Sequence, residues 1–91
     1  MAIIDHPVSK PPAAAIRCWV EGRRVCLELD DQRLVSFPAI RYPLLAKAPQ
    51  EFLERGQLRL QGRALRWEEL DEDIWVNDAV LGNFPKQPAT T

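Results

Sequence analysis

The stretch Ile16-Arg17-Cys18-Trp19-Val20-Glu21-Gly22-Arg23-Arg24-Val25-Cys26-Leu27-Glu28-Leu29 decides the fold. On both sides of Gly22-Arg23, apolar residues alternate with other residues at the period of a β-strand. A two-residue turn that begins with glycine is typical of a β-hairpin, and here it places Val20 opposite Val25. A slip of one residue would mix the two faces of the hairpin, so this register is strongly preferred. The same register sets Cys18 and Cys26 on opposite faces, where they cannot form a disulfide.

A second hairpin is expected to follow, with a two-residue turn at Asp31-Gln32. Leu29 would then lie opposite Leu34 in the second hairpin and opposite Ile16 in the first hairpin. This pairing lines the outer face of the meander with an apolar strip, formed by Trp19, Cys26, Val35 and Phe37. Either another part of the chain covers this strip, or it is a surface for a partner or a second copy. Trp19, Val35 and Phe37 are therefore candidate interface residues.

The segment from Tyr42 to Arg55 carries apolar residues at helical spacing. Pro49 would break a continuous helix but suits the first turn of a new one, which predicts two short helical pieces. Gly56 is expected to end the second piece.

A third hairpin is predicted next, with a turn at Gly62-Arg63 that would set Arg59 directly opposite Arg66. Like charges that face each other across two strands destabilise a sheet, so we expect an anionic group nearby.

A β-prone segment at 74–76 and one helical turn, capped by Asn77 and closed by Gly82, complete the pattern. The sequence therefore predicts an α+β fold. Its parts are a three-stranded antiparallel meander, a broken helical segment, a second β-hairpin, and a short C-terminal strand and helix.

The 91 residues suffice for one domain. Prolines near both ends favour extended backbone, so we expect an extended tail over 1–15, a single domain over 16–82 and a frayed tail over 83–91. No apolar run reaches the ~18 residues of a membrane span, and the first residues do not resemble a signal peptide. We therefore expect a cytoplasmic protein without a membrane partner, in which both cysteines stay reduced.

Enzymatic constellations are nearly absent from the sequence. The single histidine, His6, lies in the proline-rich tail, so no rigid scaffold places a Ser–His or Cys–His pair. One histidine and two cysteines on opposite faces cannot make a zinc site, and the four glycines form no phosphate-binding loop. We expect a protein that is not an enzyme, with no catalytic residue, metal or cofactor. An enzyme built on carboxylates alone remains the open alternative.

Five of the six residues at 68–73 are acidic. Residues 1–67 contain 11 basic and 7 acidic residues, which gives a net charge of +4. Residues 68–91 contain 1 basic and 6 acidic residues, which gives a net charge of −5. Three interpretations compete for the acidic segment. Its carboxylates could pair with Arg59, Arg63 and Arg66, hold a divalent metal, or form a docking surface with Trp75 exposed beside it. The spacing lacks the alternate oxygen ligands and central glycine of an EF-hand, and internal pairing is our working interpretation.

The segment Arg66-Trp67-Glu68-Glu69-Leu70-Asp71-Glu72-Asp73-Ile74-Trp75-Val76, with the short turn at 77–82, resembles the C-terminal signature of a small bacterial family. This is the family of domains of unknown function numbered 2442, in which a tryptophan precedes Leu-Asp-Glu-Asp-Ile. Two residues depart from the pattern: Gln32 stands where a glycine is usual, and Trp75 stands where a small polar residue is common. The resemblance implies a compact α+β domain, sometimes joined to a helix-turn-helix domain in longer relatives, in gene settings similar to toxin–antitoxin pairs. It implies no established activity, substrate or cofactor.

Our first hypothesis is a non-catalytic protein-interaction module, or an accessory, antitoxin-like member of a bacterial gene pair. Its partner would be another protein or a second copy of the chain, as in a homodimer. The candidate binding residues lie in or near the acidic segment: Trp67, Asp71, Glu72, Asp73, Trp75, Arg59 and Arg66. The alternative is a nucleic-acid-binding regulatory domain that uses the arginines at 17, 23, 24, 59, 63 and 66, although the net charge of −1 argues against a general nucleic-acid binder.

Overall fold

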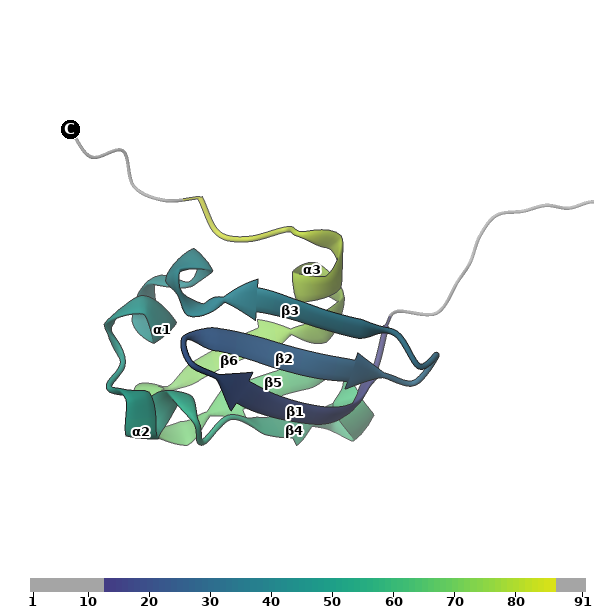
Figure 1. Cartoon of the computed structure of the whole chain (residues 1–91), viewed down its shortest axis with the longest axis horizontal. Helices are drawn as coiled ribbons and strands as arrows, with labels where there is room; N and C mark the ends of the chain where they lie inside the picture. The colour runs from purple at the N-terminus through teal and green to yellow at the C-terminus, as the bar shows by residue number, and fades with distance from the viewer. Residues whose placement is uncertain (1–12, 87–91) are drawn as a thin grey trace, which may run out of the picture.

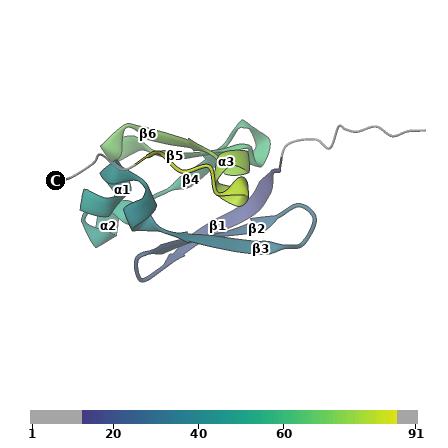
Figure 2. The same ribbon diagram turned by 90° about the horizontal axis from the view of Figure 1, so that it is seen from above.

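The computed structural model describes residues 13–86, which build two antiparallel sheets stacked face to face (Figure 1, Figure 2). Each sheet has three strands in sequence order. The first sheet contains β1 (Ala15–Glu21), β2 (Arg24–Leu29) and β3 (Leu34–Pro38), and the second contains β4 (Gln57–Arg59), β5 (Ala64–Trp67) and β6 (Glu72–Trp75). The expected α+β fold is confirmed, with β6 as the third strand of the second sheet.

Two short helices connect the sheets at one end of the stack, and a third follows the last strand (Figure 2). They are α1 (Pro43–Lys47), α2 (Gln50–Leu53) and α3 (Val76–Leu81), with 3₁₀ turns at Ala39–Arg41, Leu60–Gly62 and Glu68–Leu70. Among residues 13–86, none of these helices is long and apolar enough to span a bilayer.

The first hairpin has the expected register, with Val20 opposite Val25 and Cys18 opposite Leu27. The expected pairing at its far end is wrong, because a register shift between Ala15 and Arg17 sets Ala15 opposite Leu29. Ile16 is consequently exposed, and the smaller Ala15 enters the core. Both cysteines are free, as expected from their opposite faces.

The register expected for the second hairpin is wrong by one residue. Gln32 adopts a left-handed conformation with φ of 77° and closes a three-residue loop in which the Leu29 N–H donates to the Arg33 carbonyl. This loop type ends in a residue with positive φ, a position that glycine adopts most easily. Phe37 therefore lies opposite Val25 and is 1% exposed.

The apolar strip expected on the outer face of the first sheet does not form. Val35 lies opposite Leu27 and packs against the core, so Val35 and Phe37 are wrong as interface residues. Trp19 and Cys26 remain on the outer face, where Ser36 lies opposite Cys26.

Pro49 separates α1 from α2, as expected. Gly56 has a different role from the helix stop that we expected, because α2 already ends before Glu54. The indole of Trp67 covers Gly56 so closely that an added Cβ would lie 2.7 Å from the Trp67 Cε2 atom. Trp67 is 1% exposed, and its Nε1 donates to the Leu53 carbonyl oxygen at 2.8 Å, which fixes α2 against the second sheet.

In the third hairpin Arg59 lies opposite Ala64, so the expected pairing with Arg66 is wrong by two positions. Arg66 lies opposite Gln57. Leu60, Gln61 and Gly62 all have positive φ and make a wider loop than the two-residue turn that we expected. A shift of two residues preserves which face each side chain occupies, so Arg59 and Arg66 still share the outer face.

The folded part extends beyond residues 16–82 at both ends. The Ala13 N–H donates to the Asn77 Oδ1 at 3.1 Å, so Asn77 holds the incoming chain and does not cap α3. Gly82, with φ of 77°, closes α3 as expected. Phe84 follows and packs its ring 5.6 Å from that of Tyr42. The remaining parts of the two expected tails, including His6, lie outside the described residues.

Candidate functional site

Arg66 holds the acidic segment together from the middle strand of the second sheet. Its Nη1 donates to Asp73 at 2.7 Å, its Nη2 to Asp71 at 2.9 Å and its Nε to Glu68 at 3.1 Å. Bonds to Glu68, Asp71 and Asp73 raise the pKa of Arg66 further above its ordinary value. Asp71 reaches the guanidinium from a left-handed backbone conformation, φ 51°, at the turn into β6. The expected pairing of the acidic segment with Arg66 is therefore present in the structure.

Two further arginines contact the same segment. Arg59 reaches Glu68 at 3.5 Å, and Arg55 reaches Glu69 at 2.9 Å. The pKa of Glu69 is lowered, first by a hydrogen bond from the backbone N–H of Glu69 itself and to a smaller extent by the hydrogen bond from Arg55. Arg63, an expected partner, forms no ion pair within the described part of the chain.

Arg55 was not among the arginines expected to pair with the acidic segment. The signal was present in the strand pairing: Gln57 lies opposite Arg66, so Arg55 extends to the position across from Glu68, next to Glu69. A correct hairpin register would have identified this pair.

The two tryptophans of the family-like segment have different roles. Trp67 is buried in the core, so it is wrong as a surface binding residue. Trp75 is 58% exposed on the outer face of β6, opposite Ala64, and Leu60 beside it is 61% exposed. A hollow of about 320 Å³ lies among Leu60, Ala64, Asp73, Ile74 and Trp75.

Glu72 differs from its acidic neighbours. Its strand position pairs it with Trp67, on the opposite face from Asp73 and Arg66. It forms no ion pair among residues 13–86, and burial, with smaller effects from Asp73 and Asp71, raises its pKa. Tyr42 lies on this side of β6, and burial, followed by the charges of Asp78 and Glu72, raises the pKa of Tyr42 to about 12.

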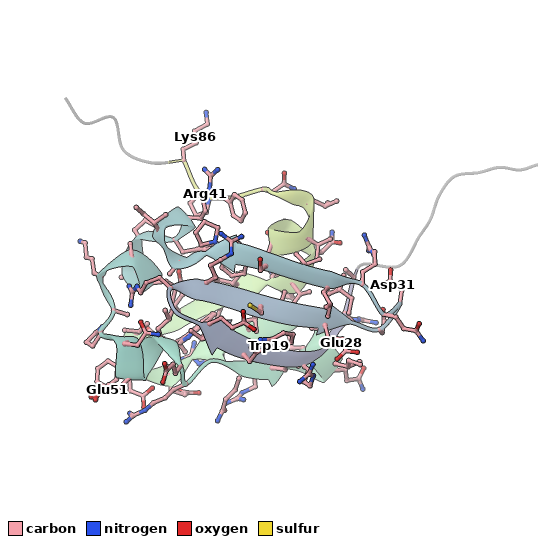
Figure 3. All side chains as sticks on the ribbon, in the orientation of Figure 1. Trp19, Glu28, Asp31, Arg41, Glu51 and Lys86 are labelled. Carbon is pink, nitrogen blue, oxygen red and sulfur yellow. The ribbon has the colours of Figure 1, made fainter. Side chains whose placement is uncertain are left out.

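On the first sheet, Trp19 faces outward beside Glu28 (Figure 3). Its Nε1 donates to Glu21 at 2.8 Å, and the guanidinium of Arg17 lies 4.4 Å from its ring centroid. Trp19 is thus covered by its own neighbours to a greater extent than Trp75.

The arginines of the nucleic-acid alternative divide between two surfaces. Arg17 and Arg24 lie on the outer face of the first sheet, whereas Arg59 and Arg66 lie on the outer face of the second. Arg23 donates to the carbonyls of α1, including Leu45 at 2.9 Å. This distribution does not assemble them into one patch.

No group of three or more His, Cys, Asp or Glu side chains among residues 13–86 is arranged to hold a metal ion. The cluster around Arg66 consists of three carboxylates that accept hydrogen bonds from one guanidinium.

A family model described as "Protein of unknown function (DUF2442)" matches residues 17–78. The chain belongs to the DUF2442 family. The match includes the whole segment 66–76 on which the resemblance in the sequence depends, and most of both sheets.

The DUF2442 fold also occurs in a crystal structure of a protein of unknown function from Rhodospirillum rubrum ATCC 11170. The two chains share 24% sequence identity with a TM-score of 0.77, over 85% of this chain and 95% of that one. At this identity the likeness establishes the fold. The curated proteins compared with the chain gave no match.

Proposed function

We propose that this DUF2442 domain is a non-catalytic protein-interaction module that binds a partner protein through the outer face of the second sheet around Trp75. The observation that carries the proposal is the exposure of Trp75, 58%, on an edge strand. Tryptophan is enriched among the residues that dominate binding energy at interfaces, and a large exposed ring gains much from burial. Leu60 extends the apolar surface next to it.

The ion pairs beside Trp75 on this outer face support the proposal. Arg66 ties Asp73 of β6 to β5, and Asp71 fixes the turn that leads into β6. The strand that presents Trp75 is therefore ordered before a partner arrives, which lowers the entropy lost on binding. An accessory or antitoxin-like member of a bacterial gene pair would use such a preformed surface.

The proposal is tested with a Trp75→Ala variant and a Leu34→Ala control, which removes another exposed apolar side chain, from β3 on the other sheet. Both variants should unfold like the parent protein. Tagged parent protein and the Leu34→Ala control should capture the same partner from the native host, and Trp75→Ala should lose at least tenfold in affinity. Light scattering across a concentration series shows whether the partner is a second copy. Equal capture by Trp75→Ala would refute the proposed surface.

A further inference from the structure

A second hollow lies on the other side of Trp75, around the free edge of β6. It has a volume of about 330 Å³ and is bordered by β6, the first turn of α3 and the segment that follows Gly82. Figure 2 shows this segment running beside the stacked sheets after α3. Its principal lining residues are Tyr42, Glu72, Trp75, Asp78 and Phe84.

The hydroxyl of Tyr42 is the first feature that points to a ligand. Tyr42 is 5% exposed, and its buried oxygen has no hydrogen-bond partner. A buried hydroxyl without a partner is uncommon in folded proteins, because burying it unsatisfied costs free energy. Glu72 and Asp78 line the same hollow as Tyr42, and their charges, after burial, contribute to the raised pKa of this hydroxyl.

The two carboxylates are the second feature. Neither Glu72 nor Asp78 forms an ion pair with any side chain that the structure describes, in contrast to Glu68, Asp71 and Asp73. Glu72 is partly buried on the inner side of the edge strand, where its charge is poorly solvated. Two carboxylates beside a hydroxyl acceptor attract a cation that can donate hydrogen bonds, in addition to the Arg41 guanidinium that lies over the neighbouring Phe84 ring.

Aromatic rings complete the site. Phe84 packs edge-on against Tyr42, and the guanidinium of Arg41 lies over the Phe84 ring at 5.1 Å. Trp75 forms part of the opposite wall. Such rings suit the aliphatic stem of a lysine or arginine and also attract its charge.

We propose that this hollow receives one lysine or arginine side chain from a basic segment of the partner protein. Its cation would pair with Glu72 and Asp78 and donate to the Tyr42 hydroxyl, while its stem would lie against Trp75 and Phe84. This inference rests on the proposed function and adds the chemistry of the partner. The carboxylates of Glu72 and Asp78, which form no ion pair with a described side chain, complement a basic segment.

The experiment titrates isotope-labelled full-length protein with N-acetyl-lysine amide and N-acetyl-arginine amide and follows the backbone amide signals. N-acetyl-norleucine amide is the uncharged control probe, because it keeps the apolar stem and lacks the cation. We expect saturable shifts at the amides of residues 72–78, 83 and 84 with at least one of the two cations, and none with the norleucine probe. Absence of saturation with both cations in the millimolar range would overturn the inference.

Variants make the test specific. The double variant Glu72→Gln/Asp78→Asn should weaken binding of the cation at least tenfold, and Tyr42→Phe about threefold. Asp30→Asn/Glu51→Gln removes the same charge from exposed carboxylates elsewhere and should leave binding unchanged. Equal affinities for the two double variants would contradict the inference.

The partner assay separates this inference from the proposed function. If Trp75→Ala abolishes capture while Glu72→Gln/Asp78→Asn captures normally, the Trp75 surface is supported as an interaction surface. The binding of a basic side chain in the hollow is then refuted. If the cation titrates normally while Trp75→Ala still captures the partner, the hollow stands and the proposed surface is refuted.

Discussion

Replacing Gly62 with alanine should destabilise the fold where the loop at 60–63 packs against the start of β1. Gly62 has φ of 87°, and a Cβ there would overlap the backbone carbonyl oxygen of Ala15 at the start of β1. A backbone carbonyl cannot rotate aside as a flexible side chain can. The substitution therefore has to displace either β1 or the loop at 60–63.

The magnitude follows from two separate effects. An L-residue in the left-handed region costs about 1–2 kcal/mol. Forcing extra volume into a packed site costs a further ~1–3 kcal/mol. Alanine also restricts the unfolded chain, which returns about 0.4–1 kcal/mol. Together these terms lower the free energy of unfolding of Gly62→Ala by roughly 1–5 kcal/mol, a substantial part of the 5–15 kcal/mol typical of a domain.

Gly22→Ala is the matched control, because Gly22 also has a positive φ, 60°, but has no atom within 4 Å of an added Cβ. It should show the backbone cost alone, about 1 kcal/mol after the same offset from the unfolded chain. Urea unfolding followed by tryptophan fluorescence measures both variants, since the buried indole of Trp67 becomes exposed on unfolding. If Gly62→Ala is no less stable than Gly22→Ala, the close approach between the loop and β1 is not a constraint on the fold.

Three further predictions concern titration, ion pairing and thiol chemistry. Because the pKa of Tyr42 is raised to about 12 in the folded protein, its contribution to the free energy of unfolding should be complete below pH 10 and be lost as the pH rises to about 12. Tyr42→Phe should not show this decline. Since Tyr42 is the single tyrosine, phenolate absorbance reports it directly. Arg66→Gln should speed amide hydrogen exchange across residues 68–73 and lower the urea midpoint, because it removes the ion pairs with Glu68, Asp71 and Asp73. Arg63→Gln should do neither. Equal exchange rates in the two variants would show that these ion pairs do not order the segment. Burial raises the pKa of Cys18 and Cys26, so alkylation of the folded protein should be slow and mass spectrometry after unfolding should find two free thiols.

The first hairpin was predictable because two independent constraints agree on its register. The glycine of Gly22-Arg23 favours a two-residue turn, and the alternation on both sides gives Val20 opposite Val25. The register shift at Ile16 was not predictable, because the alternation of apolar residues alone favours Ile16 as the residue opposite Leu29. In the structure Ala15 takes that position.

The second hairpin was not predictable from its turn residues alone. Asp31-Gln32 contains no glycine, so it does not distinguish a two-residue loop from the three-residue loop in which Gln32 adopts positive φ. The choice reverses the faces of Val35 and Phe37. Burial would have decided it, since the longer loop places both side chains on the same face as Val25 and Leu27.

Strand alternation places neighbouring carboxylates of the acidic segment on opposite faces of the second sheet. Asp73 points to the outer face and binds Arg66, while Glu72, one residue earlier, points to the inner face at the free edge of the sheet. The sequence analysis treated these carboxylates as one group and predicted their pairing with arginine. That prediction holds for Glu68, Asp71 and Asp73, because their side chains reach the same guanidinium. Glu72 is excluded from the cluster by its strand position, so the guanidinium that holds its neighbours does not pair with it.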